Sequence, residues 1–356
     1  MIFSEKSEYV YGFEKSDAAL FLQIDSLLEN NTSKVDILHQ FSSLPEDFIE
    51  TLYTLVSCQE ETQKESYSSP INIGNYLQDD LKRTSYVSNQ LTFLINYPNE
   101  EIYNRVHPVI QHLKNDLLTD DLISVDFEQH GEEWQILFNN NEIAFPVDIY
   151  KLILVLQENM ITVLYQSKPY LITMHAATIE HNDNLLIFPA VSGSGKTTLT
   201  AALMNNNFTV YSDELSVIDK KGKANTLPFS LNIKEGSWHI LEKIYPILKQ
   251  TSYHIRFDDQ KVKFLQPLKL VHKSKRPTHL IFPKYTKNAE TKVKELSACD
   301  AMSRIKEAGY QLDKPLTKND FEKILDYLLI LPKFSIEYSS LPEAIEAIKG
   351  LSIEKT

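Results

Sequence analysis

A glycine-rich loop between an apolar run and a helical pattern constrains this chain more than any other feature. Residues 190–197 read Ala-Val-Ser-Gly-Ser-Gly-Lys-Thr. The apolar run 185–189 before them predicts a buried strand, and the apolar spacing over 197–205 predicts a helix. This order of strand, loop and helix is typical of a phosphate-binding loop, or P-loop, in which backbone N–H groups turn toward an anion. The chain is therefore expected to have an α/β fold.

The residues of the loop have separate chemical roles in nucleotide binding. Gly193 and Gly195 allow the backbone to turn its N–H groups inward, Lys196 reaches the β and γ phosphates, and Thr197 offers a hydroxyl to Mg²⁺. Ala190 stands where such loops usually have glycine, and its methyl group is tolerated unless that backbone needs a positive φ. The predicted nucleotide-binding residues are Ser192, Gly193, Ser194, Gly195, Lys196, Thr197 and Thr198.

An acidic pair follows the loop and its helix. The short run 208–211 predicts a strand that ends at Ser212, Asp213 and Glu214. In a βαβ unit this strand can lie beside the first, so that the carboxyl ends of both open on one crevice. We expect Asp213 to meet the γ phosphate, where it holds Mg²⁺ or accepts a proton from an incoming hydroxyl. The alternative for Asp213 is a turn or cap residue. The predicted metal-binding residues are Thr197, Asp213 and Glu214.

His175 is the third predicted catalytic residue, with Asp213 and Lys196. It lies in the strand-like run 171–179, which is expected to pair with 185–189 as a hairpin through 180–184. We expect it to lie at the edge of the sheet near the phosphates and to have a catalytic role there. The alternative is a core histidine whose hydrogen bonds are satisfied.

A polar linker divides the rest of the chain into predicted domains. Three short helices are expected within 18–56, and the linker 59–70 is closed by Pro70. Residues 1–60 are therefore predicted to form a small helical domain, 71–147 a mixed α/β segment that packs on the core, and 148–356 the catalytic domain.

Within these boundaries, four shorter patterns predict individual elements. Strands are expected at 91–97 and 123–129, and a hairpin with an Asn-rich turn within 134–147. A strongly apolar helix is expected over 148–166. Near the C-terminus, Thr317 or Asn319 is expected to cap the helix that follows it.

Composition excludes some classes of partner. The net charge of −12 argues against broad binding to nucleic acids or anionic membranes. No apolar run approaches the ~20 residues that cross a bilayer, and no secretory signal is readable. Two distant cysteines, Cys58 and Cys299, suggest a reducing environment, so a cytoplasmic location is expected. The basic run Lys261–Arg276 is the local exception: it either meets phosphates or an acidic partner, or it is a solvated loop.

The order of these motifs resembles the HPr kinase-related family, relatives of the bacterial HPr serine kinase. The resemblance covers about 130–350 of the chain and includes the runs 276–285 and 331–348. The motifs that carry it, in chain order, are His175-Ala-Ala, the glycine-rich loop, Ser212-Asp213-Glu214-Leu215, Pro228 and Ile233-Lys234-Glu235-Gly236-Ser237. It implies a P-loop kinase core of the HPr kinase and PEP carboxykinase-like type.

The same resemblance assigns roles to individual residues. Asp213 matches the catalytic acid of the family, and Lys196 and Thr197 match its phosphate and Mg²⁺ residues. Substrate or phosphate contacts are expected from Lys234, Glu235 and Arg276. The chain departs from HPr kinase at Glu214, where that enzyme has a second Asp, and it lacks the phosphocarrier-binding signature. HPr itself is therefore not the expected acceptor.

The N-terminal helical pattern, 18–60, is similar to PqqD-like peptide-recognition domains, although any small helical bundle could give the same pattern. The chain is thus expected to be an ATP- and Mg²⁺-dependent kinase that phosphorylates Ser or Thr of a peptide or protein. A small-molecule kinase and a non-catalytic nucleotide-binding regulator remain as alternatives, and the sequence leaves the oligomeric state open.

Overall fold

The computed structural model describes residues 2–4, 9–11, 36, 82–89, 91–115, 121–313 and 317–351. The helices predicted within 18–56 lie outside these residues except at Asp36, and so does the linker 59–70. The chain divides into two compact units. One consists of Met1–Pro70 and Asp313–Leu329, and the other of Ile71–Leu312 and Ile330–Thr356.

The described residues of the first unit include two short paired strands and most of one helix. Strands β1 (Ile2–Ser4) and β2 (Tyr9–Tyr11) pair in antiparallel register. Helix α9 (Lys318–Ile330) begins after Thr317, whose hydroxyl accepts a hydrogen bond of 3.2 Å from the backbone N–H of Asp320. The prediction that Thr317 caps this helix is therefore confirmed.

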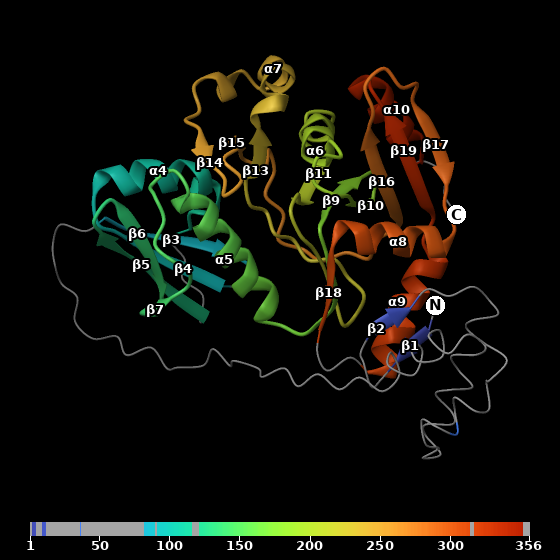
Figure 1. Ribbon diagram of the computed structural model, residues 1–356, viewed down its shortest axis with the longest axis horizontal. Helices are drawn as coiled ribbons and strands as arrows, with labels where there is room; N and C mark the ends of the chain where they lie inside the picture. The colour runs from blue at the N-terminus through green and yellow to red at the C-terminus, as the bar shows by residue number, and fades with distance from the viewer. Residues whose placement is uncertain are drawn as a thin grey trace. The chain divides into compact units, whose positions relative to one another are not determined.

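The second unit begins with a five-stranded sheet against which two helices pack, α4 (Glu100–Ile110) and α5 (Leu152–Gln166) (Figure 1). The short helix η1 (Gln111–Leu113) follows α4. The sheet order is β3 (Lys82–Ser88), β4 (Leu91–Tyr97), β5 (Asp121–His130), β6 (Glu133–Phe138) and β7 (Asn141–Glu142).

Most sequence predictions for this sheet are confirmed. The strand expected at 91–97 is β4, and the hairpin expected within 134–147 turns at Asn139 and Asn140, whose φ angles are 51° and 66°. Asparagine tolerates this left-handed backbone better than most residues. The helix expected over 148–166 begins later, at Leu152, because the Asp148 carboxylate accepts hydrogen bonds from the next N–H groups and forms a turn.

A six-stranded sheet of the second unit has the order β11-β9-β10-β16-β19-β17. Helix α6 (Lys196–Met204) lies between α7 (Glu235–Ile244) and α10 (Leu341–Leu351) (Figure 1) and contacts both. The apolar faces of α6 and α10 share a buried cluster with the sheet. The strands are β9 (Ala176–His181), β10 (Asn184–Pro189), β11 (Thr209–Ser212), β16 (His279–Tyr285), β17 (Lys292–Glu295) and β19 (Lys333–Tyr338).

The position of β11 corrects one prediction. The strand after the helix was expected beside β10, but β9 lies between the two and pairs with both. Because β9 is antiparallel to both neighbours, β10 and β11 still run in the same direction. Their carboxyl ends therefore open on the same edge of the sheet, as the prediction required. The β9–β10 hairpin itself is confirmed, with Asn182 and Asp183 at positive φ in its turn.

Two three-stranded sheets complete the second unit. One has the order β12 (Ser216–Asp219), β8 (Tyr170–Met174), β18 (Tyr310–Leu312), and the other β13 (Leu231–Lys234), β15 (Lys261–Leu265), β14 (His254–Ile255). Helix α8 (Ala298–Ala308) precedes β18, and η2 (Pro246–Lys249) follows α7. The run predicted as one strand over 171–179 is divided at His175, where the chain passes from one sheet to another.

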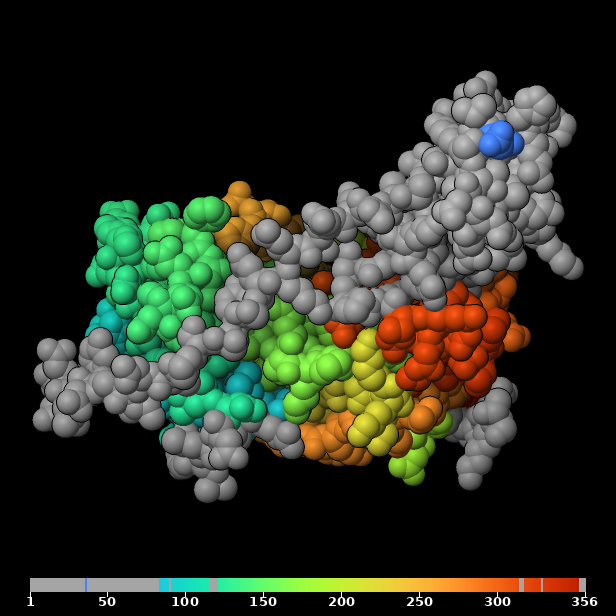
Figure 2. Space-filling model, turned by 90° about the horizontal axis from the view of Figure 1, so that it is seen from below, coloured from blue at the N-terminus to red at the C-terminus, as the bar shows by residue number. Residues whose placement is uncertain are grey.

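Backbone pairing between Ala224 and Lys275 joins the segment after β12 to the segment before β16, and these two stretches adjoin on the face shown in Figure 2. Among the described residues, no helix combines the length and the apolar character needed to cross a bilayer.

Candidate functional site

A cavity of about 720 Å³ opens above the glycine loop, which we define as residues 190–195. The loop connects β10 to α6, and the N-terminal end of α7 forms part of the opposite wall. The fold thus brings together residues that are far apart in the sequence. The predicted site residues that line the cavity are His175, Ser192, Gly193, Ser194, Gly195, Lys196, Thr197, Thr198, Glu214, Lys234 and Glu235.

The backbone of the glycine loop requires glycine at two positions. Gly193 and Gly195 have φ angles of 85° and 88°, in the left-handed region that side chains disfavour. Gly195 is also the N-cap of α6, so the free N–H groups of that helix begin at the loop. Ala190 has no positive φ, which explains why a methyl group is tolerated there.

Two tyrosines that the sequence analysis missed hold the loop in place. The N–H of Tyr285 donates a hydrogen bond of 2.8 Å to the carbonyl of Ser194, and the hydroxyl of Tyr338 donates one of 3.3 Å to the carbonyl of Gly195. A Cβ atom on Gly195 would lie 2.9 Å from the Tyr338 hydroxyl oxygen. Tyr285 is the last residue of β16 and Tyr338 the last residue of β19, both in the six-stranded sheet. A tyrosine at the end of each apolar run was the one feature of the sequence that could have indicated a contact with the loop.

Lys196, which lines the cavity, forms a buried pair with Asp213, which was predicted to meet the γ phosphate but is not among the lining residues. The Lys196 ammonium donates a hydrogen bond to the backbone carbonyl of Asp213 and lies 3.9 Å from its carboxylate. Only 6% of the lysine side chain and 5% of the aspartate side chain are exposed. Among the described residues, neither carboxylate oxygen of Asp213 has a hydrogen-bond partner. A buried carboxylate without hydrogen bonds is costly, and the ammonium of Lys196 is the charge that offsets this cost.

His175 and Glu214 form a second, more exposed pair on the cavity wall. The imidazole Nε2 lies 3.7 Å from a carboxylate oxygen of Glu214. Burial lowers the pKa of His175, and the positive charge of Lys196 acts in the same direction, against the opposing effect of Glu214 and Asp213. His175 is therefore neutral at pH 7.

The start of α7 adds a lysine and a hydroxyl to the loop. The Lys234 ammonium donates a hydrogen bond of 3.2 Å to the hydroxyl of Ser192, and the hydroxyls of Thr198 and Ser237 lie 2.6 Å apart. Both α6 and α7 direct their N-terminal ends at the cavity. Two helix N-termini together with Lys234 make this wall favourable for a polyanion.

The cavity has a donor set that fits a magnesium–nucleotide complex. Among the described residues, no group of three or more His, Cys, Asp and Glu is placed to hold a metal ion alone. Magnesium bound with a nucleotide usually takes one or two carboxylates and completes its coordination with phosphate oxygens and water. The Thr197 hydroxyl and the Glu214 carboxylate line the cavity and match that requirement, whereas Asp213 is not among the lining residues.

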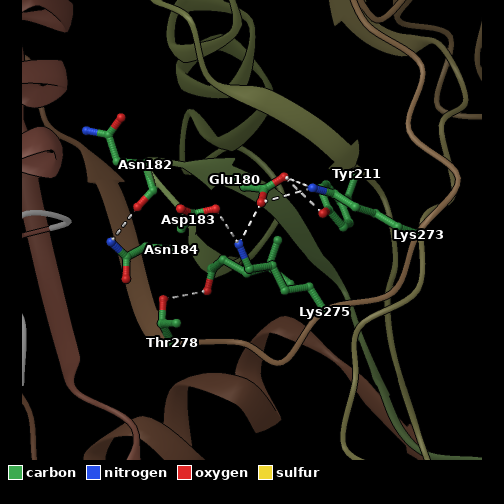
Figure 3. Close-up of polar contacts among 9 residues, drawn as sticks. Glu180, Asn182, Asp183, Asn184, Tyr211, Lys273, Lys275 and Thr278 are labelled. Carbon is green, nitrogen blue, oxygen red and sulfur yellow. Dashed lines mark hydrogen bonds and ion pairs between the residues drawn. The ribbon is translucent and has the colours of Figure 1, made fainter.

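The structure does not bring Arg276 to this cavity. Arg276 precedes β16, which is parallel to β10, so it lies at the edge of the sheet opposite the glycine loop. Its neighbours in the basic run are engaged elsewhere: Lys273 and Lys275 bind Glu180 at 2.9 and 2.7 Å (Figure 3). Of the basic residues in 261–276, only Lys261 lines the cavity, so the run is not one continuous site.

Arg256, in the β14–β15 connection, lines the cavity and was not predicted. Its Nε atom lies 3.4 Å from a carboxylate oxygen of Asp258. The arginine stands in no recognisable motif, and no signal in the sequence indicated that β14 and β15 would reach the glycine loop.

Comparison with known proteins assigns no family: no protein-family model matches the chain, and no curated protein matches it.

Proposed function

We propose that this chain is an ATP- and Mg²⁺-dependent kinase that transfers the γ-phosphoryl group to a Ser or Thr hydroxyl of a peptide or protein. One observation carries the proposal: the Asp213 carboxylate is buried without a hydrogen-bond partner, 3.9 Å from the lysine of a glycine loop. In the proposal, Lys196 turns to a phosphate when the nucleotide binds, and the carboxylate that this movement uncovers accepts the proton of an attacking hydroxyl.

The proposed phosphate cradle consists of the loop N–H groups, Lys196 and Lys234. On nucleotide binding, Lys196 would exchange its hydrogen bond with the Asp213 carbonyl for one with a phosphate oxygen. Bound Mg²⁺ would neutralise charge on the phosphates, and the Thr197 hydroxyl with Asp213 or Glu214 would hold it. These are the roles expected of the same residues from the sequence.

In the proposed transfer, the acceptor oxygen forms a bond to the γ phosphorus while the bond to the bridging oxygen of ADP breaks. The hydroxyl proton passes to Asp213. His175 stays neutral and positions Glu214, its neighbour at 3.7 Å. Much of the catalysis in such a reaction comes from orientation and charge stabilisation, which a rigid loop and two helix ends supply.

The assignment of the fold to a particular type of kinase core is part of the same proposal. We take the six-stranded sheet with its glycine loop as a P-loop kinase core of the HPr kinase and PEP carboxykinase-like type, as the motif order suggests. The cytoplasm is the proposed location, since ATP is supplied there and the exposed thiol of Cys299 is unpaired. A peptide acceptor is proposed from the resemblance of 18–60 to PqqD-like domains, which lies outside the described residues.

The test is transfer of radiolabel from γ-labelled ATP by the full-length chain in the presence of Mg²⁺. Two acceptor sets are offered separately, an array of Ser- and Thr-containing peptides and a mixture of hydroxylated metabolites, with Asp213→Asn as the matched control. Label on a peptide hydroxyl that disappears in the control supports the proposal. Label on metabolites alone makes the chain a small-molecule kinase. Retention of intact ATP with neither acceptor labelled overturns the kinase and favours a nucleotide-binding regulator.

A further inference from the structure

The chain changes direction in the six-stranded sheet between β10 and β16. These two strands are adjacent and parallel, so their carboxyl ends lie at the same edge of the sheet (Figure 1). From β10 the chain continues through α6 to β11 on one side, whereas the strands of this sheet that follow β16 lie on the other side. In open α/β sheets, ligands bind outside the carboxyl ends of the strands at such a switch point. The end of β16 is therefore placed to meet a ligand that the glycine loop holds.

Tyr285 is the last residue of β16 and adjoins the glycine loop. Its N–H donates a hydrogen bond of 2.8 Å to the carbonyl of Ser194, and its Cβ atom lies 3.0 Å from the position of a Cβ atom built on Gly195. That hydrogen bond involves only the backbone of Tyr285, and 47% of the residue is exposed. The side chain is thus accessible beside the start of α6, and the hydrogen bond to the loop does not depend on it.

The neighbours of Tyr285 hold its ring in place. The rings of Tyr285 and Tyr338 are in edge contact, with their centres 5.9 Å apart and their planes at 72°. The next residue, Thr286, donates a backbone hydrogen bond of 2.9 Å to the carbonyl of Tyr338 and a hydroxyl hydrogen bond of 2.7 Å to Glu337. An aromatic ring that is already ordered loses little conformational freedom when a flat group stacks on it. Tyr285 therefore offers a preorganised stacking surface.

The two sides of α6 differ, and this difference gives a nucleotide one orientation. One side of α6 packs against β11, β13 and α7, and the cavity above the glycine loop is bounded by α7 on that side. Asp213 follows β11 on the same side. The other side of α6 packs with β16, β19 and α10. The γ phosphate and the base are at opposite ends of ATP, so a γ phosphate near Asp213 directs the base across Gly195 toward Tyr285.

We infer, on the basis of the proposed function, that the ring of Tyr285 stacks on the base of the nucleotide whose phosphates the glycine loop holds. Every base has a flat π face, so stacking adds affinity without selecting among bases. The loop N–H groups and Lys196 hold the phosphates. A polyphosphate that lacks a base therefore binds without the help of Tyr285, and this difference can be measured.

The test is a calorimetric titration of the full-length chain with ATP and, separately, with tripolyphosphate, both with Mg²⁺. Tripolyphosphate has three phosphates and no base. We expect Tyr285→Ala to weaken ATP binding about tenfold and to leave tripolyphosphate binding unchanged. Tyr285→Phe keeps the ring and should retain ATP affinity within about twofold. Phe145→Ala is the control: it removes an aromatic residue that is 91% exposed and does not line the cavity, and both affinities should stay unchanged.

Three results would overturn the inference. They are equal ATP affinities in the wild type and Tyr285→Ala, a loss in Tyr285→Phe as large as in Tyr285→Ala, and a loss of tripolyphosphate affinity as large as that for ATP. In the last case the ring would act only through the shape of the loop. Phosphoryl transfer is measured on the same preparations. The expected affinities without transfer would overturn the kinase and leave base stacking in place, whereas a wild type that binds neither ligand would overturn both.

Discussion

The ammonium of Lys196 donates a hydrogen bond to the backbone carbonyl of Asp213 and lies 3.9 Å from the carboxylate of the same residue. The cation that a phosphate would need and the base that a hydroxyl would need are thus held together below the glycine loop. A phosphate that attracts Lys196 would leave Asp213 with less charge compensation, and so more ready to accept a proton. The predictions for Lys196 and Asp213 rest on this relationship.

Lys196→Ala should lower ATP turnover by about 10³ or more, because the phosphates lose a charge-assisted contact that strengthens in the transition state. Turnover is measured by release of labelled product from ATP, and folding is checked by circular dichroism. Undiminished turnover in a folded variant would remove the glycine loop from the mechanism.

Asp213→Asn should lower turnover by about 10² or more, while nucleotide affinity changes only a few-fold, because the amide keeps the shape but cannot take the proton. Affinity is measured by fluorescence with a labelled nucleotide. Glu214→Gln is the neighbouring control and should have a smaller effect, since that side chain is 47% exposed. Near-normal turnover in Asp213→Asn would show that Asp213 is a turn or cap residue without a catalytic role.

Lys234→Ala should raise the KM for ATP about five- to tenfold with little change in kcat, because the ammonium beside Ser192 contributes binding in both the ground state and the transition state. Lys243→Ala is the control, an exposed lysine near the end of the helix that Lys234 precedes, and it does not line the cavity. The KM for ATP and kcat of both variants are measured by steady-state kinetics. Equal KM values in the two variants would contradict a phosphate contact for Lys234.

Gly195→Ala should abolish measurable nucleotide binding. The backbone φ of 88° is unfavourable for alanine, and the added methyl would lie 2.9 Å from the Tyr338 hydroxyl oxygen and 3.0 Å from the Tyr285 Cβ. The double variant Gly195→Ala/Tyr338→Phe relieves only part of the crowding and should stay defective. Wild-type affinity in the single variant would show that the loop has another conformation in solution.

Acid should destabilise the fold in the range between pH 6.5 and about 4. Burial lowers the pKa of His254 from 6.5 to about 4, helped by the charge of Arg105. Its stabilising contribution is therefore complete above pH 6.5 and is lost as the pH falls toward 4, because the unfolded chain takes up a proton that the folded chain does not.

The free energy of unfolding in urea, measured across this range, checks this prediction. In His254→Gln the slope against pH should be shallower than in the wild type, whatever the change in absolute stability. Exposed His239→Gln is the control and should keep the wild-type slope. Identical slopes for the wild type and His254→Gln would show that His254 does not titrate differently in the folded chain.

Local patterns in the sequence predicted much of what surrounds the glycine loop. The loop, its flanking strand and helix, the β9–β10 hairpin and the cap at Thr317 all depend on backbone preferences and hydrogen bonds between residues close in the chain. Such interactions are encoded by a few adjacent residue types, for instance the glycines at positive φ and the asparagines in turns. They could be recognised without knowledge of the rest of the fold.

Contacts between distant segments depended on how the sheets assembled. The insertion of β9 between β10 and β11, the hydrogen bonds from Tyr285 and Tyr338 to the loop, and the placement of Arg276 at the opposite edge follow from strand order and direction. Strand order is determined by the total burial of apolar surface over the whole sheet, which no short pattern records. For the same reason a cavity of about 470 Å³ that joins η1, the end of α5 and residues 270–274 left no motif in the sequence.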